Sequence, residues 1–348
     1  GSGPSGPTTG GGGGMGKRAA SKGPGYEDWT FWWNFNKDDI LQLKSAVKKT
    51  QTGTGTAVHV FGRKKTTGEV KSATDAAIQK DIVPSLRAML DEKDLNFDIQ
   101  SAAALALAKI GDKTIVPTLK KMSLNDGKDY HRVVEESAAL AFGLLQDDSD
   151  ENRAHLIEII SDKDRNASFV RPFAAISLGL LGAENEKYNT SFEALKDILA
   201  GRESKPDIKP AALVAIGLLQ NEQAVPDLLF MLENGKVDKK GAEDLKDTEL
   251  AFVVQALGKI GRPGTDENET AVVDKVTALL TGKGKKKADT NIRRSSAIAL
   301  GQLAPQCDAK VQGKIIDTLK GVAKAGQDAS ERNFAMVALG RIAAADGV

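Results

Sequence analysis

The sequence offers few side chains that could perform catalysis or bind a metal ion. Its three histidines are His59, His131 and His155, and no His-Glu-x-x-His or Cys-x-x-Cys spacing places two metal ligands on one element. The single cysteine, Cys307, has no histidine near it in the sequence and follows an apolar segment. We therefore interpret it as a structural thiol and not as a nucleophile. We therefore predict no catalytic residue, no metal site and no cofactor, and we expect that the chain is not an enzyme.

Other polar clusters also lack a recognisable chemistry. No phosphate-binding Gly-x-x-x-x-Gly-Lys-Ser/Thr loop is present, and the Gly53-Thr54-Gly55 turn lacks the strand-then-helix context of a dinucleotide site. Asp147, Asp148 and Asp150 are interpreted as a solvated turn. With no chemistry to place, the sequence is most informative about its architecture.

The dominant pattern is a short segment that occurs seven times. Each copy has a small residue, then a large apolar residue that we call the anchor, then glycine in six copies and alanine in the first. The anchors are Leu107, Phe142, Leu178, Ile216, Leu257, Leu300 and Leu339. They are separated by 35, 36, 38, 41, 43 and 39 residues. Because glycine inside a helix costs about 1 kcal/mol relative to alanine, the recurring glycine predicts close approach between neighbouring helices.

Each anchor ends a segment with helical spacing, and a second apolar segment precedes it. Three of these first segments open with Val83-Pro84, Val116-Pro117 and Val225-Pro226, and proline is tolerated in the first turn of a helix. A repeated helix-turn-helix unit of about 40 residues predicts an all-α fold, in which stacked hairpins bury one continuous core.

The repeat resembles the HEAT repeat, in particular the short bacterial, PBS-lyase-like form that ends in Ala-Leu-Gly-x-Leu-Gly. Val170-Arg171 and Ile292-Arg293 match the Val-Arg pair that often opens its second helix, whereas Val134-Glu135 and Glu331-Arg332 depart from it. The resemblance covers about residues 80–345. It implies an α-solenoid, a right-handed superhelix of about seven hairpins whose second helices line the concave side.

The same resemblance suggests a binding surface at the start of the second helices. We expect outward-pointing side chains there to form a candidate partner surface. Its members are Gln100, Glu135, Arg171, Lys209, Arg293, Arg294 and Arg332. The surface is mixed in charge near its start and basic toward its end. A solvated row with local ion pairs is the alternative interpretation.

The first seventy residues differ from the rest. Residues 1–25 are rich in Gly, Pro, Ser and Thr, which predicts a disordered tail, and residues 26–72 form a second region before the solenoid of residues 73–348. All three tryptophans lie in an aromatic block that is interpreted as an N-terminal cap or as a hot spot for a partner. The block comprises Trp29, Phe31, Trp32, Trp33 and Phe35. It resembles a block in exported bacterial HEAT-repeat proteins, which favours a periplasmic or cell-envelope location over the cytoplasm.

Charge and hydropathy limit the partners. The net charge is only +1, and residues 1–72 carry 11 Lys/Arg against 5 Asp/Glu. No apolar run predicts a membrane span. We expect a monomeric, non-catalytic scaffold or adaptor that binds a protein on the concave face. The alternatives are a repeat enzyme related to bilin lyases, and nucleic-acid binding through the basic end of the candidate surface and Lys283 to Lys287, which we regard as unlikely without interleaved aromatic residues.

Overall fold

A computed structural model describes residues 75–92, 95–165, 169–182, 185–203, 206–238, 244–261, 267–283 and 288–345. The chain separates into two units, residues 1–58 and 59–348, and the described residues all belong to the second. The predicted tail, the predicted cap with its aromatic block, and residues 284–287 of the lysine-rich loop lie outside the described residues.

The described part of the chain consists of seven helical hairpins, which confirms the predicted fold class. The first helices of the hairpins are α4 (Val83–Asp91), α6 (Val116–Leu124), α8 (Asp150–Ser161), α10 (Asn185–Ala200), α12 (Val225–Asn234), α14 (Glu267–Thr281) and α16 (Ala309–Ala325). The second helices are α5 (Phe97–Ile110), α7 (Arg132–Leu145), α9 (Val170–Leu180), α11 (Ile208–Leu219), α13 (Asp247–Ile260), α15 (Thr290–Leu303) and α17 (Ala329–Ala345). Helix α4 continues from the short α3 (Asp75–Ala77) through a π-helical turn, Ile78–Ile82.

Local sequence signals explain where several helices begin. Pro117 and Pro226 lie in the first turn of α6 and α12, where the missing N–H needs no partner. Ser149 accepts a hydrogen bond from the N–H of Asn152 and so caps α8, and Asp308 accepts bonds from the second and third N–H groups of α16. These caps fix where helices α8 and α16 begin.

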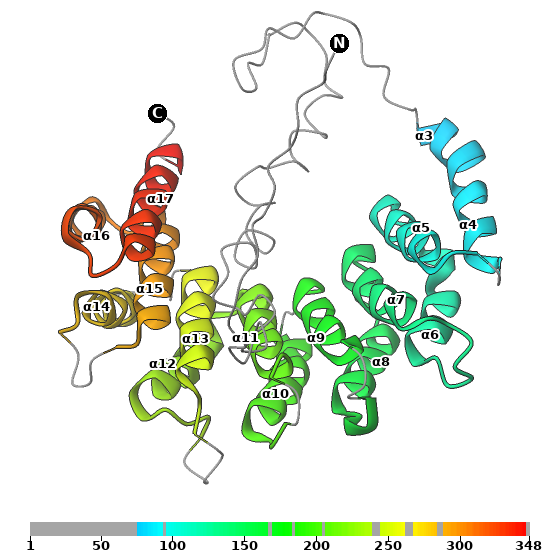
Figure 1. The fold of residues 1–348 in the computed structure, drawn as a ribbon, viewed down its shortest axis with the longest axis horizontal. Coiled ribbons are helices and arrows are strands. Elements are labelled where there is room, and N and C mark those ends of the chain that lie inside the picture. The colour runs from blue at the N-terminus through cyan, green and yellow to red at the C-terminus, as the bar shows by residue number, and fades with distance from the viewer. Residues whose placement is uncertain are drawn as a thin grey trace, which may run out of the picture. The chain divides into compact units, whose positions relative to one another are not determined.

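The seven second helices form one continuous row. Every neighbouring pair in the row is in contact, and Figure 1 shows the second helices side by side on the inner side of a curved arrangement, with the first helices along the outer side. We therefore call them the inner and outer helices. Contacts between outer helices are much sparser, and among the described residues those of α8 with α10 and of α14 with α16 are the most extensive. The core lies between the two rows, where the anchors Leu107, Leu178 and Leu300 are fully buried.

The glycines after the anchors lie where inner helices approach most closely. A Cβ atom built on Gly179 would stand 2.6 Å from the Cα of Ala215 in the next inner helix, and one on Gly301 would stand 2.8 Å from the Cα of Ala338. Gly143, Gly217 and Gly258 meet the next inner helix in the same way. The prediction of close helix approach is confirmed, and the stacking unit is a glycine of one helix against a small residue of the next.

Candidate functional site

Helical geometry decides which side chains of the inner helices can meet a ligand. Successive residues turn by about 100°, so residues two before and two after the anchor lie about 160° and about 200° from it, on the side away from the core. The residues two before the anchors are Leu105, Leu140, Ile176, Val214, Gln255, Ile298 and Val337. Those two after are Lys109, Leu144, Leu180, Leu218, Lys259, Gln302 and Arg341. We call these fourteen positions the inner stripe.

The inner stripe is apolar and partly exposed in the second and third hairpins. Leu140 and Leu144 on α7 and Ile176 and Leu180 on α9 are all partly accessible. Two aromatic residues extend the α9 side by one and two turns: Phe173, which is partly accessible, and Phe169, which is 46 % exposed. These six residues form the apolar patch, the candidate functional site of this protein.

The two helices that carry the patch are held in a fixed relation. The Ser177 hydroxyl of α9 donates a hydrogen bond of 2.7 Å to the Ala139 carbonyl of α7. The backbone N–H of Phe169 donates to the Glu136 Oε1 atom of α7 over 2.9 Å, and Glu136 also lies 3.5 Å from Arg132. The patch is therefore built on two connected helices, which favours a preformed binding surface.

Along the rest of the inner stripe the character changes. Val214, Ile298 and Gln302 are buried, whereas Lys109 is exposed and Arg341 is partly exposed. The stripe contains Lys109, Lys259 and Arg341 but no Asp or Glu. An apolar central section with basic positions on either side is suited to a ligand that is apolar in the middle and acidic at its ends.

The sequence placed the candidate partner surface elsewhere, and four of its seven residues do not point outward. Gln100, Arg171, Lys209 and Arg293 are buried, with Arg171 only 1 % exposed. The physical reason is the helical repeat: all of the seven except Arg294 lie seven residues before an anchor, which is almost two full turns, so they lie about 20° from it on the side that faces the core. At this position Glu135 and Arg332 keep partial exposure. Glu135, Arg294 and Arg332 are partly exposed, and as partner contacts these three stay predictions.

Several of these side chains stabilise the turn inside each hairpin. Arg171 donates from Nε to the Ile160 carbonyl at the end of α8 (2.9 Å), and its two terminal nitrogens form a buried bidentate pair with Glu203 at 2.8 and 3.2 Å. Gln100 donates to the Glu92 carbonyl over 2.8 Å in the equivalent place. The second residue of the Val-Arg pair thus satisfies backbone carbonyls near the end of the outer helix.

Arg293 and Arg332 also donate to backbone carbonyls in the turn that precedes their own helix. Arg293 donates to the Ala288 carbonyl (3.2 Å) and pairs with Glu331 of α17 (3.2 Å), with both side chains buried. Arg332 donates to the Gly326 carbonyl over 2.8 Å. The buried pairs of Arg171 and Arg293 join neighbouring hairpins, so we assign these two side chains to the architecture.

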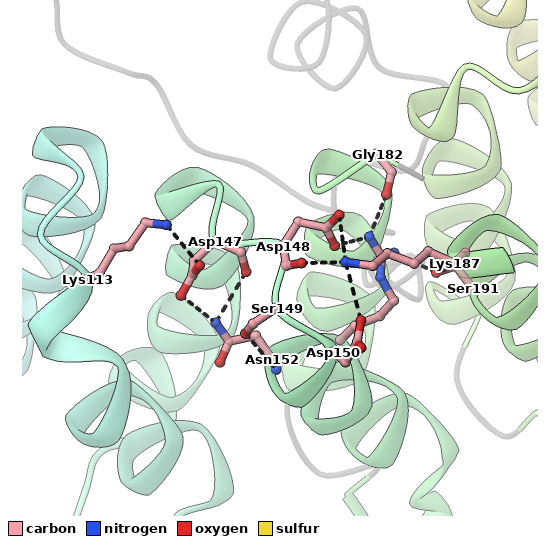
Figure 2. A network of polar contacts seen from close by, with 10 residues as sticks. Lys113, Asp147, Asp148, Ser149, Asp150, Asn152, Gly182, Lys187 and Ser191 are labelled. Atoms are coloured by element: carbon pink, nitrogen blue, oxygen red, sulfur yellow. Dashed lines mark hydrogen bonds and ion pairs between the residues drawn. The ribbon is translucent and has the colours of Figure 1, made fainter. Parts of the chain in front are cut away.

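The aspartates between α7 and α8 also link hairpins, which differs from the expected solvated turn. Figure 2 shows that Asp147 accepts a hydrogen bond of 3.0 Å from Lys113, at the start of the second hairpin. Its second carboxylate oxygen lies 3.1 Å from the amide nitrogen of Asn152 in α8.

The network continues into the fourth hairpin. Arg153, which is almost fully buried, donates to the Asp148 carboxylate and to the Gly182 carbonyl at 2.8 Å. Lys187 of α10 lies 3.2 Å from Asp150 and 3.5 Å from Asp148, and the hydrogen bond with Asp150 raises the pKa of Lys187. The acidic groups have cationic partners within the chain, so we interpret this cluster as a connection between hairpins (Figure 2).

His131, His155 and Cys307 have structural contacts, whereas His59 lies outside the described residues. His131 accepts from the N–H of Val133 at the start of α7 and stacks on Phe97. His155 lies 2.9 Å from the hydroxyl of Ser123, and Cys307 donates to the Leu303 carbonyl. Across the described ranges, no group of three or more His, Cys, Asp or Glu residues could hold a metal ion.

The hairpin array and its inner row define the class of protein, an α-solenoid repeat protein. Residues 99–125, which cover most of α5 and all of α6, match the PBS lyase HEAT-like repeat family. The matched segment is a HEAT-like repeat, and the other hairpins share its two-helix form. None of the helices in the described part of the chain is long and apolar enough to span a membrane.

Solved structures with a similar fold include proteins of different kinds. The complex of CpcE and CpcF of phycocyanin lyase from Nostoc sp. PCC7120 is 18 % identical over 80 % of this chain and 98 % of that chain, with a TM-score of 0.43. Human deoxyhypusine hydroxylase is 16 % identical over 77 % and 98 %, with a TM-score of 0.31. A designed armadillo repeat protein is 14 % identical over 75 % and 99 %, with a TM-score of 0.30. Likenesses of this size carry no functional inference, and a comparison with curated proteins found no match.

The family match corrects one expectation from the sequence. The chain was expected not to be an enzyme, but the repeat family that it matches is named for a lyase. The absence of a familiar catalytic motif is therefore not a reason to exclude catalysis in a repeat protein of this type.

Proposed function

We propose that this protein binds a protein segment on the inner face of its solenoid, through the apolar patch on α7 and α9. The observation that supports the proposal is the partial exposure of six apolar side chains on two adjacent, connected helices. Contact of leucine, isoleucine and phenylalanine side chains with water is unfavourable. Full burial of one such side chain contributes about 1.5–3 kcal/mol. A ligand that covers the patch recovers this energy.

The partner is an amphipathic helix with an acidic flank. On α9, Phe169, Phe173, Ile176 and Leu180 follow one another at spacings of four, three and four residues, so they form a straight apolar row. A helix laid along α7 and α9 presents apolar groups at the same spacing. Lys109 on the neighbouring inner helix α5 favours an acidic group on the flank of the ligand that faces α5.

A selection of displayed peptides tests this proposal directly. Peptides retained by the chain should carry apolar residues at positions i, i+3 or i+4, and i+7, with Asp or Glu outside that core. Phe169→Glu should weaken them by about 2 kcal/mol, roughly thirty-fold, because it places a charge against the apolar face of the ligand. Ala154→Glu, at an exposed position of outer helix α8, is the matched control and should leave binding unchanged.

Two results would contradict the proposal. Retained peptides without apolar periodicity would show that the patch is not the binding surface. Equal retention by the wild-type chain and Phe169→Glu would do the same, provided that the circular dichroism of the two proteins agrees.

The family match supports a second candidate function, a role related to bilin lyases. An apolar face with two phenylalanines could also cover a flat tetrapyrrole, because aromatic rings stack on conjugated ligands. Mixing the chain with a free bilin should then shift the absorbance spectrum, and Phe173→Ala should reduce the shift. An unchanged spectrum, with no transfer of the bilin to an acceptor protein, would remove this candidate.

A further inference from the structure

The exposed large apolar side chains of this protein gather at the two ends of the array. In the described residues there are six: Ile82, Met89, Ile99, Phe169, Met336 and Val337. Phe169 belongs to the apolar patch. The other five lie on the first and last hairpins, whose outward end faces meet no further hairpin within the residues that the structure describes.

The end face of α17 repeats a surface that is buried elsewhere in the array. Met336 and Val337 are 53 % and 38 % exposed, whereas their equivalents in α15, Ala297 and Ile298, are 0 % and 7 % exposed. Gly340 has nothing within 4 Å of a Cβ atom built on it, whereas the equivalent Gly301 meets Ala338 at 2.8 Å. Helix α17 therefore keeps the small residue and the apolar side chains of a stacking surface without a helix against them.

The first inner helix carries the complementary surface. The small residue before its anchor is Ala106, at the position that meets the glycine of the preceding inner helix in the third to seventh hairpins. One turn and two turns earlier, on the same face, are Ala102 and Ile99, and one turn later is Ile110. Ile99 is 44 % exposed, although its equivalent in α9, Val170, is fully buried.

We propose that the chain binds a second copy of itself head to tail, with α17 of one copy packed against α5 of the next. The contact continues the interface that already joins α15 to α17, with Gly340 against Ala106 in place of Gly301 against Ala338. Met336 packs beside Ile99 in this arrangement. A second copy is the occupant because its first hairpin supplies the small residue Ala106 at the required register, with Ile99 and Ala102 on the same face and Lys109 at the position where Lys259 borders Gly217 inside the array.

This interface uses different surfaces from the apolar patch, so it is independent of the proposed function. It also departs from the expectation of a monomer. Because the two faces differ, each added copy leaves one free face of each kind, and association does not close at a dimer.

Complementation between two blocked variants tests the proposal. Met336→Glu blocks the tail face, Ile99→Glu blocks the head face, and both side chains are exposed, so folding is retained. In sedimentation velocity, the wild-type chain should form larger species as concentration rises from low to high micromolar, and each variant alone should stay monomeric. A mixture of the two should form a one-to-one dimer that does not grow, because one intact tail meets one intact head.

Two control variants and two contrary outcomes complete the sedimentation experiment. Ala154→Glu on outer helix α8 should associate like the wild type. Gly340→Leu should fold, because nothing lies within 4 Å of a Cβ atom at that position, and it should block the tail face without adding a charge. A wild-type chain that stays monomeric throughout would overturn the proposal. Association that survives in Ile99→Glu but not in Met336→Glu, with no gain on mixing, would also overturn it, because it would indicate a symmetric tail-to-tail dimer.

Discussion

The recurring glycine after the anchor makes a prediction that distinguishes packing from helix propensity. Gly179→Ala and Gly340→Ala change the same repeat position in the same way. At Gly179 the added methyl would stand 2.6 Å from both the Cα and the carbonyl oxygen of Ala215, whereas at Gly340 it meets nothing within 4 Å. The first substitution must therefore push two helices apart, and the second need not move anything.

The magnitudes oppose each other at Gly179. Alanine improves helix propensity by about 1 kcal/mol, and overpacking a tight site costs about 1–3 kcal/mol. Because the contacted atoms of Ala215 are backbone and cannot rotate away, the upper part of that range applies, and we expect a net loss of about 1–2 kcal/mol in the free energy of unfolding. Gly340→Ala should instead gain about 1 kcal/mol.

Urea unfolding followed by far-ultraviolet circular dichroism measures both effects, at protein concentrations low enough to avoid association. Midpoints are compared, because a repeat array need not unfold in one step. Gly217→Ala provides a graded control, since its nearest contact is the Cα of Ala256 at 3.0 Å, and it should lose less than Gly179→Ala. If Gly179→Ala unfolds at the same urea concentration as the wild type or a higher one, the close-approach explanation is refuted.

Three further predictions concern buried and capping polar groups. Arg171→Met should cost about 3–5 kcal/mol because it leaves the Glu203 carboxylate buried without its partner, and adding Glu203→Gln should recover part of the loss in urea unfolding. The hydrogen bond from Arg87 holds the pKa of Asp112 below its usual range. The stability from this pair is therefore present above the ordinary aspartate pKa and is lost as the pH falls through the lowered pKa of Asp112. Asp112→Asn should flatten this acid dependence of the thermal midpoint. Asp308→Ala should lower the thermal midpoint by removing the cap of α16, and a midpoint equal to that of the wild type would contradict the role of that side chain.

Much of the fold could be predicted because the same residue pattern occurs in seven repeats, so each feature of the pattern can be recognised by comparing the copies. The anchors, the prolines that open α6 and α12, and the glycines at the helix contacts all follow from spacing and residue size. The π-helical turn before α4 has no such signal, and a single irregular turn cannot be averaged over copies.

The candidate site was harder to predict, for two physical reasons. The family motif directed attention to Arg171 and its equivalents, but counting by about 100° per residue would have placed them on the core side. Counting two residues before and after each anchor finds Leu140, Ile176 and Leu180, so this part was present in the sequence. The pairing of Arg171 with Glu203 was not, because Glu203 lies in a loop with no periodic position.

The unequal contacts of the two helix rows have a mechanical consequence. The inner helices touch at glycine and cannot come closer or slide without a clash, while most outer helices are joined less tightly. Bending the array therefore changes the spacing of the outer helices and leaves the spacing of the inner helices constant. A ligand on the inner face therefore binds to the part of the protein that deforms least. A second molecule bound between outer helices would change the curvature of the surface that this ligand contacts.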